Sequence, residues 1–483
     1  MTTANDKQAK GTGFNPLSRD NIEALTMAII MAVMLKYFIV EAYKIPTGSM
    51  QPTLLGNEDT GIFDRIIVDK LSYHYRDPER WEVTVFKYPL DRSKNFIKRL
   101  CGMPGEDFQI ADGDLWTRPD ERSEWKILRR PRPIQQEVWK RINPADPRYL
   151  AWKPIDSARG WSIDGRSKIT ARGDGAVRLP ADGATVLDMY SDGYPSNMGS
   201  LLSRARTAPG LNACGDLRLS GEVAALAGTQ RVVVELTEGS RRYSFELPGP
   251  AADANARPKI SAALGNEKPV DAVQALAEKD WKLTAGKRVS FAVQNMDDLL
   301  QLEIDGDIVA TLEIPRALDQ TSSYVLRVEG EGADFEDVEI WRDIYYTTGT
   351  KGRDYRIPPG HYVMLGDNTL DSHDSREWMY ANYSWSGPGS EGREVRGQWY
   401  DRSNPVRVND AAGPRIFFRD EWGELHDFME KDAKEGARTP GPFVPRNLIT
   451  GRAVIVFWPL TWIWPGDWGN DRVPKVTRLR WIH

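Results

Sequence analysis

An uninterrupted apolar segment at residues 24–40 limits what the N-terminal part of this chain can form. It reads A-L-T-M-A-I-I-M-A-V-M-L-K-Y-F-I-V and contains a single charge, Lys36. A run of about 17 apolar residues reaches the lower limit for crossing a bilayer as a helix, and apolar flanks extend it here. We therefore predict one transmembrane helix over residues 21–43, preceded by a polar, disordered tail at residues 1–20.

Two other readings of this segment stay open. A cleaved signal peptide is disfavoured, because no A-x-A-like site follows and the apolar run exceeds a typical signal-peptide core. A buried helix of a soluble domain is the second. Lys7, Lys10 and Arg19 precede the segment, which favours an N-terminus in the cytoplasm. The chain is then a single-pass protein of the cell membrane, with its remainder on the outer face.

Length and composition predict several domains that are mainly β. A chain of 483 residues is too long for one ordinary core. It holds 41 Gly and 31 Pro and shows little helical periodicity, which favours strands joined by many turns. The net charge of -5 is spread evenly, so nucleic acid is not an expected partner.

Cysteine and histidine usage argues against a metal or cofactor. Cys101 and Cys214 cannot form a disulfide framework or a zinc site. A single bridge between them stays open, although two small buried thiols are the favoured reading. The five histidines show no metal-ligand spacing. We expect no cofactor and no metal ion.

A rigid turn follows the apolar segment at residues 45–54, I-P-T-G-S-M-Q-P-T-L. Pro46, Gly48 and Pro52 are incompatible with a continuous helix and favour an exposed turn. Ser49 lies in its middle, between small neighbours. A hydroxyl on a stiff loop has the access and fixed direction that a nucleophile needs, although most serines in such turns only shape the backbone.

Lys98 lies in a second notable segment, residues 95–107, N-F-I-K-R-L-C-G-M-P-G-E-D. On a strand, Phe96, Lys98 and Leu100 share one face, with Ile97 on the other. An amine between two apolar side chains is desolvated, which lowers its pKa from about 10.4 and makes a neutral base available. An exposed lysine on an edge strand is the alternative.

Short alternating runs recur through residues 156–343 and predict a self-contained β-sandwich. The clearest covers residues 299–314, where Asp305 and Gly306 form the hairpin turn. The D-G hairpin and the closing F-E-D-V-E-I-W resemble laminin-G/concanavalin-like sandwiches. That resemblance implies a scaffold or a domain that binds glycan or protein. Residues 112–155 resolve into no clear elements, and residues 386–442 are expected to form a surface excursion.

Two later blocks complete the pattern. Residues 361–376, H-Y-V-M-L-G-D-N-T-L-D-S-H-D-S-R, form a short strand that runs into a loop dense in polar groups. Residues 444–459, V-P-R-N-L-I-T-G-R-A-V-I-V-F-W-P, contain the last strong strand. Together with P-T-G-S-M-Q-P-T-L, D-R-I-I-V-D-K-L-S-Y and F-I-K-R-L-C-G-M-P-G-E, they occur in the order found in bacterial-type signal peptidase I. The chain resembles this Ser/Lys peptidase family over residues 44–112, 344–376 and 444–460.

The resemblance implies roles for six residues. Ser49 would be the acylated nucleophile and Lys98 its general base. Ser372 would orient the lysine amine, and Asp374 and Arg376 would form a supporting ion pair. The oxyanion hole would combine the Ser49 backbone N–H with the side chain two residues earlier, usually a serine and here Thr47. We expect the Ser49 oxygen and the Lys98 nitrogen to lie roughly 2.6–3.2 Å apart.

The full prediction is a mainly β protein: a signal-peptidase-type antiparallel β catalytic domain that contains an inserted sandwich and follows one transmembrane helix. Residues 44–155 and 344–483 would form the two parts of the catalytic domain, with residues 156–343 as the insertion. It would remove signal peptides from exported preproteins at the lipid bilayer. The alternative is a membrane-anchored protein that binds glycan or protein on a degenerate peptidase scaffold.

Overall fold

The computed structural model describes most of the chain in fifteen stretches, and its elements are mainly β-strands. The described residues are 19–57, 62–141, 152–155, 160–164, 168–179, 214–263, 273–316, 322–348, 354–369, 372–385, 393–400, 403–411, 413–462, 472–474 and 479–483. The predicted tail lies almost wholly outside them. The mainly β fold class is confirmed.

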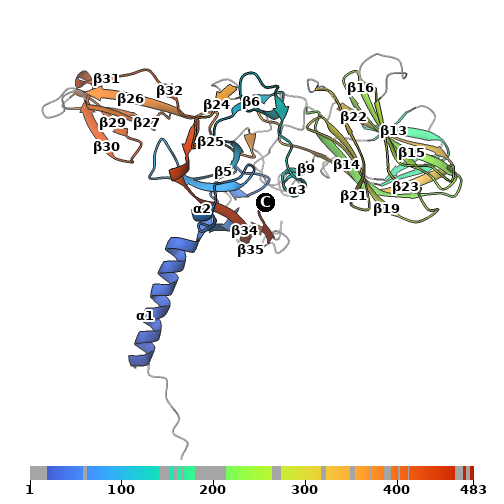
Figure 1. The fold of residues 1–483 in the computed structure, drawn as a ribbon, viewed down its shortest axis with the longest axis horizontal. Coiled ribbons are helices and arrows are strands. Elements are labelled where there is room, and N and C mark those ends of the chain that lie inside the picture. Colours follow the sequence, from blue (N-terminus) through green and yellow to red (C-terminus); the bar gives the residue numbers. More distant parts are fainter. Residues whose placement is uncertain are drawn as a thin grey trace, which may run out of the picture.

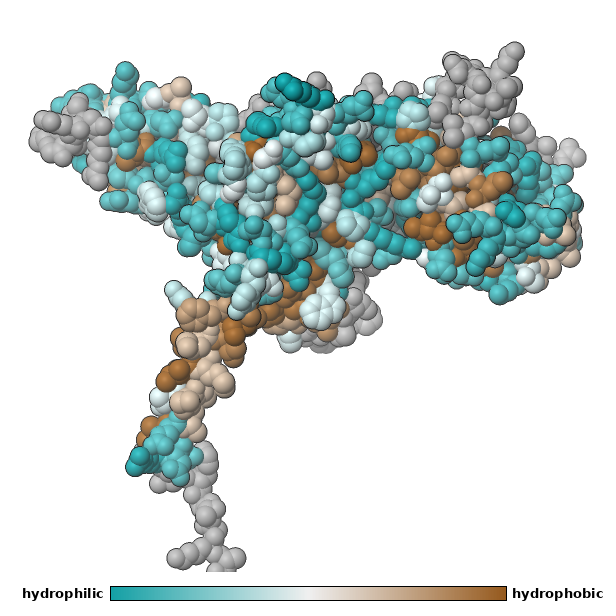
Figure 2. Space-filling view, viewed as in Figure 1, coloured by the Kyte–Doolittle hydropathy of each residue, from teal (hydrophilic) through white to brown (hydrophobic). Residues whose placement is uncertain are grey.

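One exposed helix projects from the body of the molecule (Figure 1). It comprises α1 (Arg19–Met34) and a π-helical turn, η1 (Leu35–Ile39). No residue of either is buried, and the 21 residues are long and apolar enough to cross a membrane. Figure 2 shows the apolar surface running from this helix to the base of the body. These features fit the predicted membrane helix.

The predicted helix end at residue 43 is wrong. The chain leaves the helix after Ile39 and continues as strand β1 (Val40–Lys44). β1 pairs antiparallel with β3 (Ile62–Asp69), with Tyr43 opposite Ile66. Residues such as Val40 and Tyr43 suit a strand. Pairing satisfies backbone groups at the edge of the sheet, so sheet formation, and not loss of apolar character, ends the helix.

A ten-stranded antiparallel sheet carries the predicted nucleophile and base segments. Its main path is β1-β3-β34-β4-β5-β25-β33. The further members are β2 (Gly56–Asn57), β4 (Val83–Lys87), β5 (Asn95–Gly102), β25 (His361–Leu365), β33 (Phe443–Pro445), β34 (Ile449–Trp462), β35 (Arg472–Pro474) and β36 (Arg480–Trp481). Three buried segments far apart in sequence, around residues 98, 364 and 453, thus meet in one sheet.

A small sheet extends this region through residues that gave no clear sequence pattern. Its order is β24-β6-β7-β8, with helix α3 after it. The elements are β6 (Asp107–Ala111), β7 (Asp114–Arg118), β8 (Lys126–Ile127), α3 (Arg132–Val138) and β24 (Asp354–Arg356). Phe108, Leu115 and Val138 share one buried cluster with Val363 of β25, so the small sheet packs against the main one.

Two facing sheets form the predicted β-sandwich (Figure 1). The first has the order β10-β13-β22-β15-β16-β17-β18, and the second β11-β12-β23-β14-β19-β20-β21 with β9 beside β23. Their bounds are β9 (Lys140–Arg141), β10 (Lys153–Ile155), β11 (Ser162–Asp164), β12 (Lys168–Arg172), β13 (Gly175–Leu179), β14 (Leu217–Ala225), β15 (Thr229–Glu238), β16 (Arg241–Pro248), β17 (Lys259–Ala263), β18 (Val273–Leu276), β19 (Val289–Met296), β20 (Leu299–Ile304), β21 (Asp307–Glu313), β22 (Ser322–Gly330) and β23 (Gly332–Arg342). β9 and β10 lie before residue 156, so strand pairing starts earlier than the sequence indicated.

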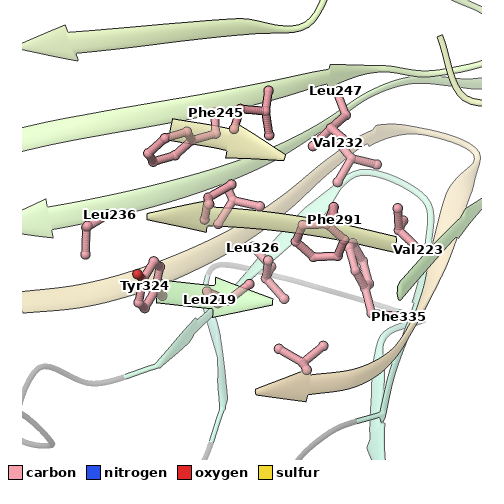
Figure 3. Close-up of a cluster of buried hydrophobic side chains, with 14 of the residues drawn as sticks. Leu219, Val223, Val232, Leu236, Phe245, Leu247, Phe291, Tyr324, Leu326 and Phe335 are labelled. Atoms are coloured by element: carbon pink, nitrogen blue, oxygen red, sulfur yellow. The ribbon is translucent and has the colours of Figure 1, made fainter. Parts of the chain in front are cut away.

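Alternating side chains of both sheets meet between them. β14 has the burial pattern expected of a strand with one inward face, alternating along its whole length. Figure 3 shows Leu219 and Phe335 of one sheet and Leu236, Phe245 and Leu326 of the other in one apolar cluster. The predicted hairpin turn at residues 305–306 joins β20 to β21, and Asp305 and Gly306 both have positive φ.

The prediction of a surface excursion at residues 386–442 is wrong. This region forms two further small sheets with a shared core. The strands are β26 (Met379–Trp385), β27 (Arg393–Gln398), β28 (Val406–Asp410), β29 (Gly413–Arg419), β30 (Leu425–Met429), β31 (Ala433–Glu435) and β32 (Thr439–Pro440). Ile416, Phe418 and Phe428 are buried beneath charged outward faces, where Arg415 pairs with Asp427. The abundant charges obscured the alternation in the sequence.

Candidate active site

The Ser49 turn is fixed to the protein body from two sides. Ile45, Met50 and Leu54 are buried in a cluster with the strands β3 and β4. From the other side, the Asn368 backbone N–H donates to the Ser49 carbonyl at 3.1 Å, and Asn368 Nδ2 donates to the Gly48 carbonyl at 3.0 Å. The turn is therefore anchored by apolar packing and by the loop that follows β25.

Lys98 points at this turn from an interior strand of the sheet. β5 lies between β4 and β25, with Lys98 opposite Thr84. The Lys98 Nζ atom lies 2.6 Å from Ser49 Oγ, within the range predicted from the sequence. Lys98 is 4% exposed and Ser49 is 8% exposed. A hydroxyl and an amine in direct contact, with little access for water, can exchange a proton.

The faces of β5 agree with the predicted alternation. Phe96 and Leu100 contact one buried cluster, whereas Ile97 contacts another. Lys98 Nζ lies 5.8 Å from the centre of the Phe96 ring, on the apolar face. The alternative of an exposed lysine on an edge strand is excluded.

Asp374 and Arg376 form the predicted ion pair in the loop after β25. Arg376 Nε and Nη2 donate to the two carboxylate oxygens of Asp374 at 2.8 and 2.7 Å. Burial opposes the charge on Asp374, but Arg376 and the Gly366 N–H outweigh it and hold the pKa of Asp374 below its ordinary value. Arg376 also donates to the carbonyl of Thr369 at 3.1 Å. The pair therefore holds the loop in one shape beside β5.

Ser372, predicted to orient the lysine amine, lies close to Gly366 beside the Ser49 backbone. A Cβ atom on Gly366 would lie 2.1 Å from Ser372 Oγ and 2.5 Å from the Ser49 carbonyl oxygen, so these groups crowd around Gly366. Ser372 Oγ is buried and finds no hydrogen-bond partner among the described residues. Its role in orienting the lysine amine stays a prediction. Thr47 is exposed in the same turn, and its oxyanion role also stays a prediction.

Sequence reasoning missed a buried pair beneath the site. Arg99 Nε and Nη2 donate to the Asp367 carboxylate at 2.9 and 2.8 Å, and both residues are fully buried. Burial opposes the charge on Arg99, but Asp367 raises its pKa above the ordinary value. Thr53 Oγ1 donates to the same carboxylate. The pair links the Ser49 turn, β5 and the loop after β25.

The two cysteines form no disulfide with each other. Cys101 lies on β5, whereas Cys214 lies in the sandwich core, and both thiols are buried. Burial raises the pKa of the Cys101 thiol to about 12, so it stays protonated at neutral pH. The favoured reading of two small buried thiols is confirmed.

Comparison with known proteins finds a family match for the N-terminal segment. Residues 18–137, which include Ser49 and Lys98, match the family model described as "Signal peptidase, peptidase S26". The resemblance to signal peptidase I is confirmed. A probable signal peptidase I-2 of Synechocystis is 40% identical over 100 residues, which cover 20% of this chain and 43% of the relative. The signal peptidase I of Leptolyngbya laminosa is 36% identical over 102 residues, covering 20% and 47%.

The similarity to the two signal peptidases covers only part of this chain and part of each relative. The chain spans less than half the length of these two relatives. Among solved structures, a carbohydrate-binding module from Bacillus subtilis is similar over 39% of this chain and 94% of its own, with 12% identity and a TM-score of 0.24. A glycan or protein ligand of the sandwich stays a prediction from the sequence.

Proposed function

We propose that this chain is a membrane-bound serine endopeptidase that removes N-terminal signal peptides from exported preproteins. The contact between Ser49 Oγ and Lys98 Nζ, at 2.6 Å, is the observation that carries the proposal. It joins the two residues that the signal peptidase resemblance assigns as nucleophile and base, and both lie in the segment that matches the family model. Their burial separates the pair from bulk water.

The proposed reaction has two halves. Lys98 Nζ takes the proton of Ser49 as Oγ attacks the scissile carbonyl carbon. Collapse of the tetrahedral intermediate breaks the C–N bond, and the protonated Lys98 gives its proton to the leaving amine. An acyl-enzyme on Ser49 remains. Lys98 then deprotonates a water molecule, which attacks the ester, and the proton returns to Ser49 as the signal peptide leaves.

Neighbouring groups would support both halves. We assign oxyanion stabilisation to the Ser49 N–H and the Thr47 hydroxyl, where one donor is worth about 3 kcal/mol in analogous sites. Ser372 would orient the amine. Asp374 and Arg376 would keep the loop in place beside it, which the two hydrogen bonds between them support. Substrates of such peptidases carry small side chains at the first and third residues before the cut.

The membrane helix would place the reaction at the bilayer. A preprotein is held there by its own apolar signal segment, so anchoring the enzyme raises the effective concentration of both. We propose that residues 1–20 lie in the cytoplasm and that the peptidase residues, 44–155 and 344–483, lie on the outer face. Residues 156–343 would be an insertion, to which strand pairing adds β9 and β10.

Cleavage of a preprotein by the purified full chain in detergent tests the proposal. We expect one cut after a small residue, identified by mass spectrometry of both products. Ser49→Ala and Lys98→Ala should each reduce the rate at least a thousandfold, because each removes a reacting group. Lys87→Ala is the matched control, since Lys87 is an exposed lysine on the adjacent strand. Absence of cleavage by the wild type, or retained activity in either variant, would reject the proposal.

A further inference from the structure

Three carboxylates from distant parts of the chain meet where the small sheet approaches the sandwich. Asp114 begins β7, Asp216 lies just before β14, and Asp297 is the first residue of the turn between β19 and β20. One carboxylate oxygen of each lies within 4.8 Å of the other two. The peptidase region therefore supplies one acid of the cluster, and the sandwich supplies two.

One carboxylate oxygen of the cluster is buried and accepts no hydrogen bond from the described residues. Asp297 is 3% exposed, and its Oδ2 atom makes no hydrogen bond among the described residues. Its backbone N–H donates to Asp216 Oδ1 at 3.0 Å, which keeps the two acids adjacent. A buried carboxylate oxygen without a donor is costly unless the carboxyl group is protonated or a positive charge is bound to it.

Asn295, two residues before Asp297, carries a second buried side-chain oxygen. Asn295 is 3% exposed, and its Nδ2 atom lies 3.4 Å from the carbonyl of Gly215, the neighbour of Asp216. The Asn295 Oδ1 atom is buried and has no hydrogen-bond partner within the described part of the chain. Asn295 and Asp297, which belong to one hairpin, thus each carry a buried side-chain oxygen that accepts no hydrogen bond from the described residues.

The nearby arginines direct several of their donors to other oxygens. Arg129 Nε donates to the carbonyl of Asp297 at 3.0 Å, and Arg129 Nη2 donates to Glu313 at 2.9 Å. Arg130 Nη1 donates to Asp343. The charges on Arg129 and Arg130 moderate the negative charge of the junction, while these donors bond to the Asp297 carbonyl, Glu313 and Asp343.

We propose that Asp114, Asp216 and Asp297 bind a divalent cation that prefers oxygen ligands, Ca²⁺ first. Carboxylate and amide oxygens are the ligands of such hard ions. Ca²⁺ accepts a flexible set of protein oxygen ligands, whereas Mg²⁺ demands near-ideal octahedral geometry and usually keeps several waters, so a site built from protein oxygens suits Ca²⁺ better. Bound at the junction, the ion would tie the sandwich to the peptidase region.

The test is calcium binding by the full chain in detergent after removal of metals with EDTA. Isothermal titration with CaCl₂ should reveal one site, and MgCl₂ should bind more weakly. Asp297→Asn should weaken calcium binding at least tenfold. Asp305→Asn is the matched control, because Asp305 occupies a hairpin turn of the same sheet with a similar positive φ and lies outside the cluster. Asn tolerates that backbone conformation.

Thermal unfolding gives a second readout that also monitors folding. Saturating Ca²⁺ should raise the Tm of the wild type by about 3 °C or more and leave that of Asp297→Asn unchanged. Should Asp297→Asn fail to fold, Asp114→Asn takes its place. The proposal is overturned if the wild type does not bind Ca²⁺ at millimolar concentration. It is equally overturned if the folded variant binds as tightly as the control. Neither outcome depends on peptidase activity.

Discussion

At the scale of single residues, Gly366 controls how closely the loop after β25 approaches the nucleophile. An added Cβ atom would overlap Ser372 Oγ and the Ser49 carbonyl oxygen. We predict that Gly366→Ala lowers kcat/KM for preprotein cleavage about a hundredfold, because a displacement near 1 Å is that costly to a reacting pair. Gly436→Ala, where the nearest contact is 3.3 Å, should keep wild-type activity. Equal rates for both variants would contradict a steric role of Gly366.

Ser372 offers a sharper test of positioning. If its hydroxyl orients the Lys98 amine during the reaction, Ser372→Ala should lower kcat at least tenfold with little change in KM. The pH profile of kcat/KM should shift as well, because the environment of the base changes. Ser372→Thr should restore part of the rate. A variant with normal kcat and an unchanged profile would leave Ser372 as a packing residue.

The two candidate catalytic residues could be found from the sequence because their signals are local. Proline and glycine frame Ser49, and strand alternation places Lys98 between Phe96 and Leu100. Arg99 carries no comparable signal. Its partner, Asp367, is 268 positions away, and alternation alone does not tell which polar side chain on a buried face is paired. That Ser372 Oγ is buried without a hydrogen-bond partner among the described residues was equally invisible, since it depends on side-chain geometry.

At the scale of elements, the pair of Arg99 and Asp367 joins β5 to the loop after β25. We predict that Asp367→Ala destabilises the peptidase region by about 3–5 kcal/mol, because it leaves the Arg99 charge buried without its partner. The double variant Arg99→Met/Asp367→Leu should be less destabilised than Asp367→Ala, since no isolated charge remains. Urea unfolding followed by tryptophan fluorescence measures both. A double variant that is the least stable would show that the charges themselves hold these elements together.

The contact between helix α2 (Ser72–Tyr75) and β4 depends on pH, because it includes the charged side chain of Glu82. Burial opposes its charge, but hydrogen bonds from Arg76, the Glu79 N–H and the Tyr73 hydroxyl hold the pKa of Glu82 below its ordinary value of about 4.3. The resulting stability is fully present above the unfolded pKa and is lost as pH falls through the folded pKa.

We therefore predict that Glu82→Gln lowers the Tm at pH 7 and that the gap to the wild type closes as pH falls below about 4. Thermal unfolding at pH 7, 5 and 3.5 measures this gap. Glu79→Gln is the control, because the Glu79 side chain is 71% exposed. A gap that stays constant with pH would mean that shape, and not charge, makes Glu82 important.

Elements differ in how far their boundaries follow from the sequence. The hairpin at residues 299–314 alternates strongly, so β20 and β21 were foreseen closely. Hydropathy alone cannot separate the end of the membrane helix from β1, because Val40 and Tyr43 suit both. The distal strands β28–β30 present charged outer faces, and only the three-dimensional pairing reveals the buried row of Ile416 and Phe418.

At the scale of the whole molecule, the boundary between helix and sheet predicts two different outcomes for N-terminal truncation. α1 and η1 bury none of their residues, so a chain that starts at Val40 loses no core. A chain that starts at Ile45 also lacks β1 and leaves the edge of β3 unpaired from Arg65 to Asp69. We expect the first truncation to unfold at the wild-type temperature and the second several degrees lower.

Activity gives a second test of the chain that starts at Val40. The chain that starts at Val40 should cleave a short water-soluble peptide about as fast as the wild type, because Ser49 and Lys98 are held by elements that it retains. It should cleave a preprotein in liposomes at least tenfold more slowly, since the helix no longer concentrates enzyme and substrate at one surface. Both rates falling together would show that the helix also shapes the site. Both rates staying unchanged would show that membrane anchoring adds nothing to substrate capture.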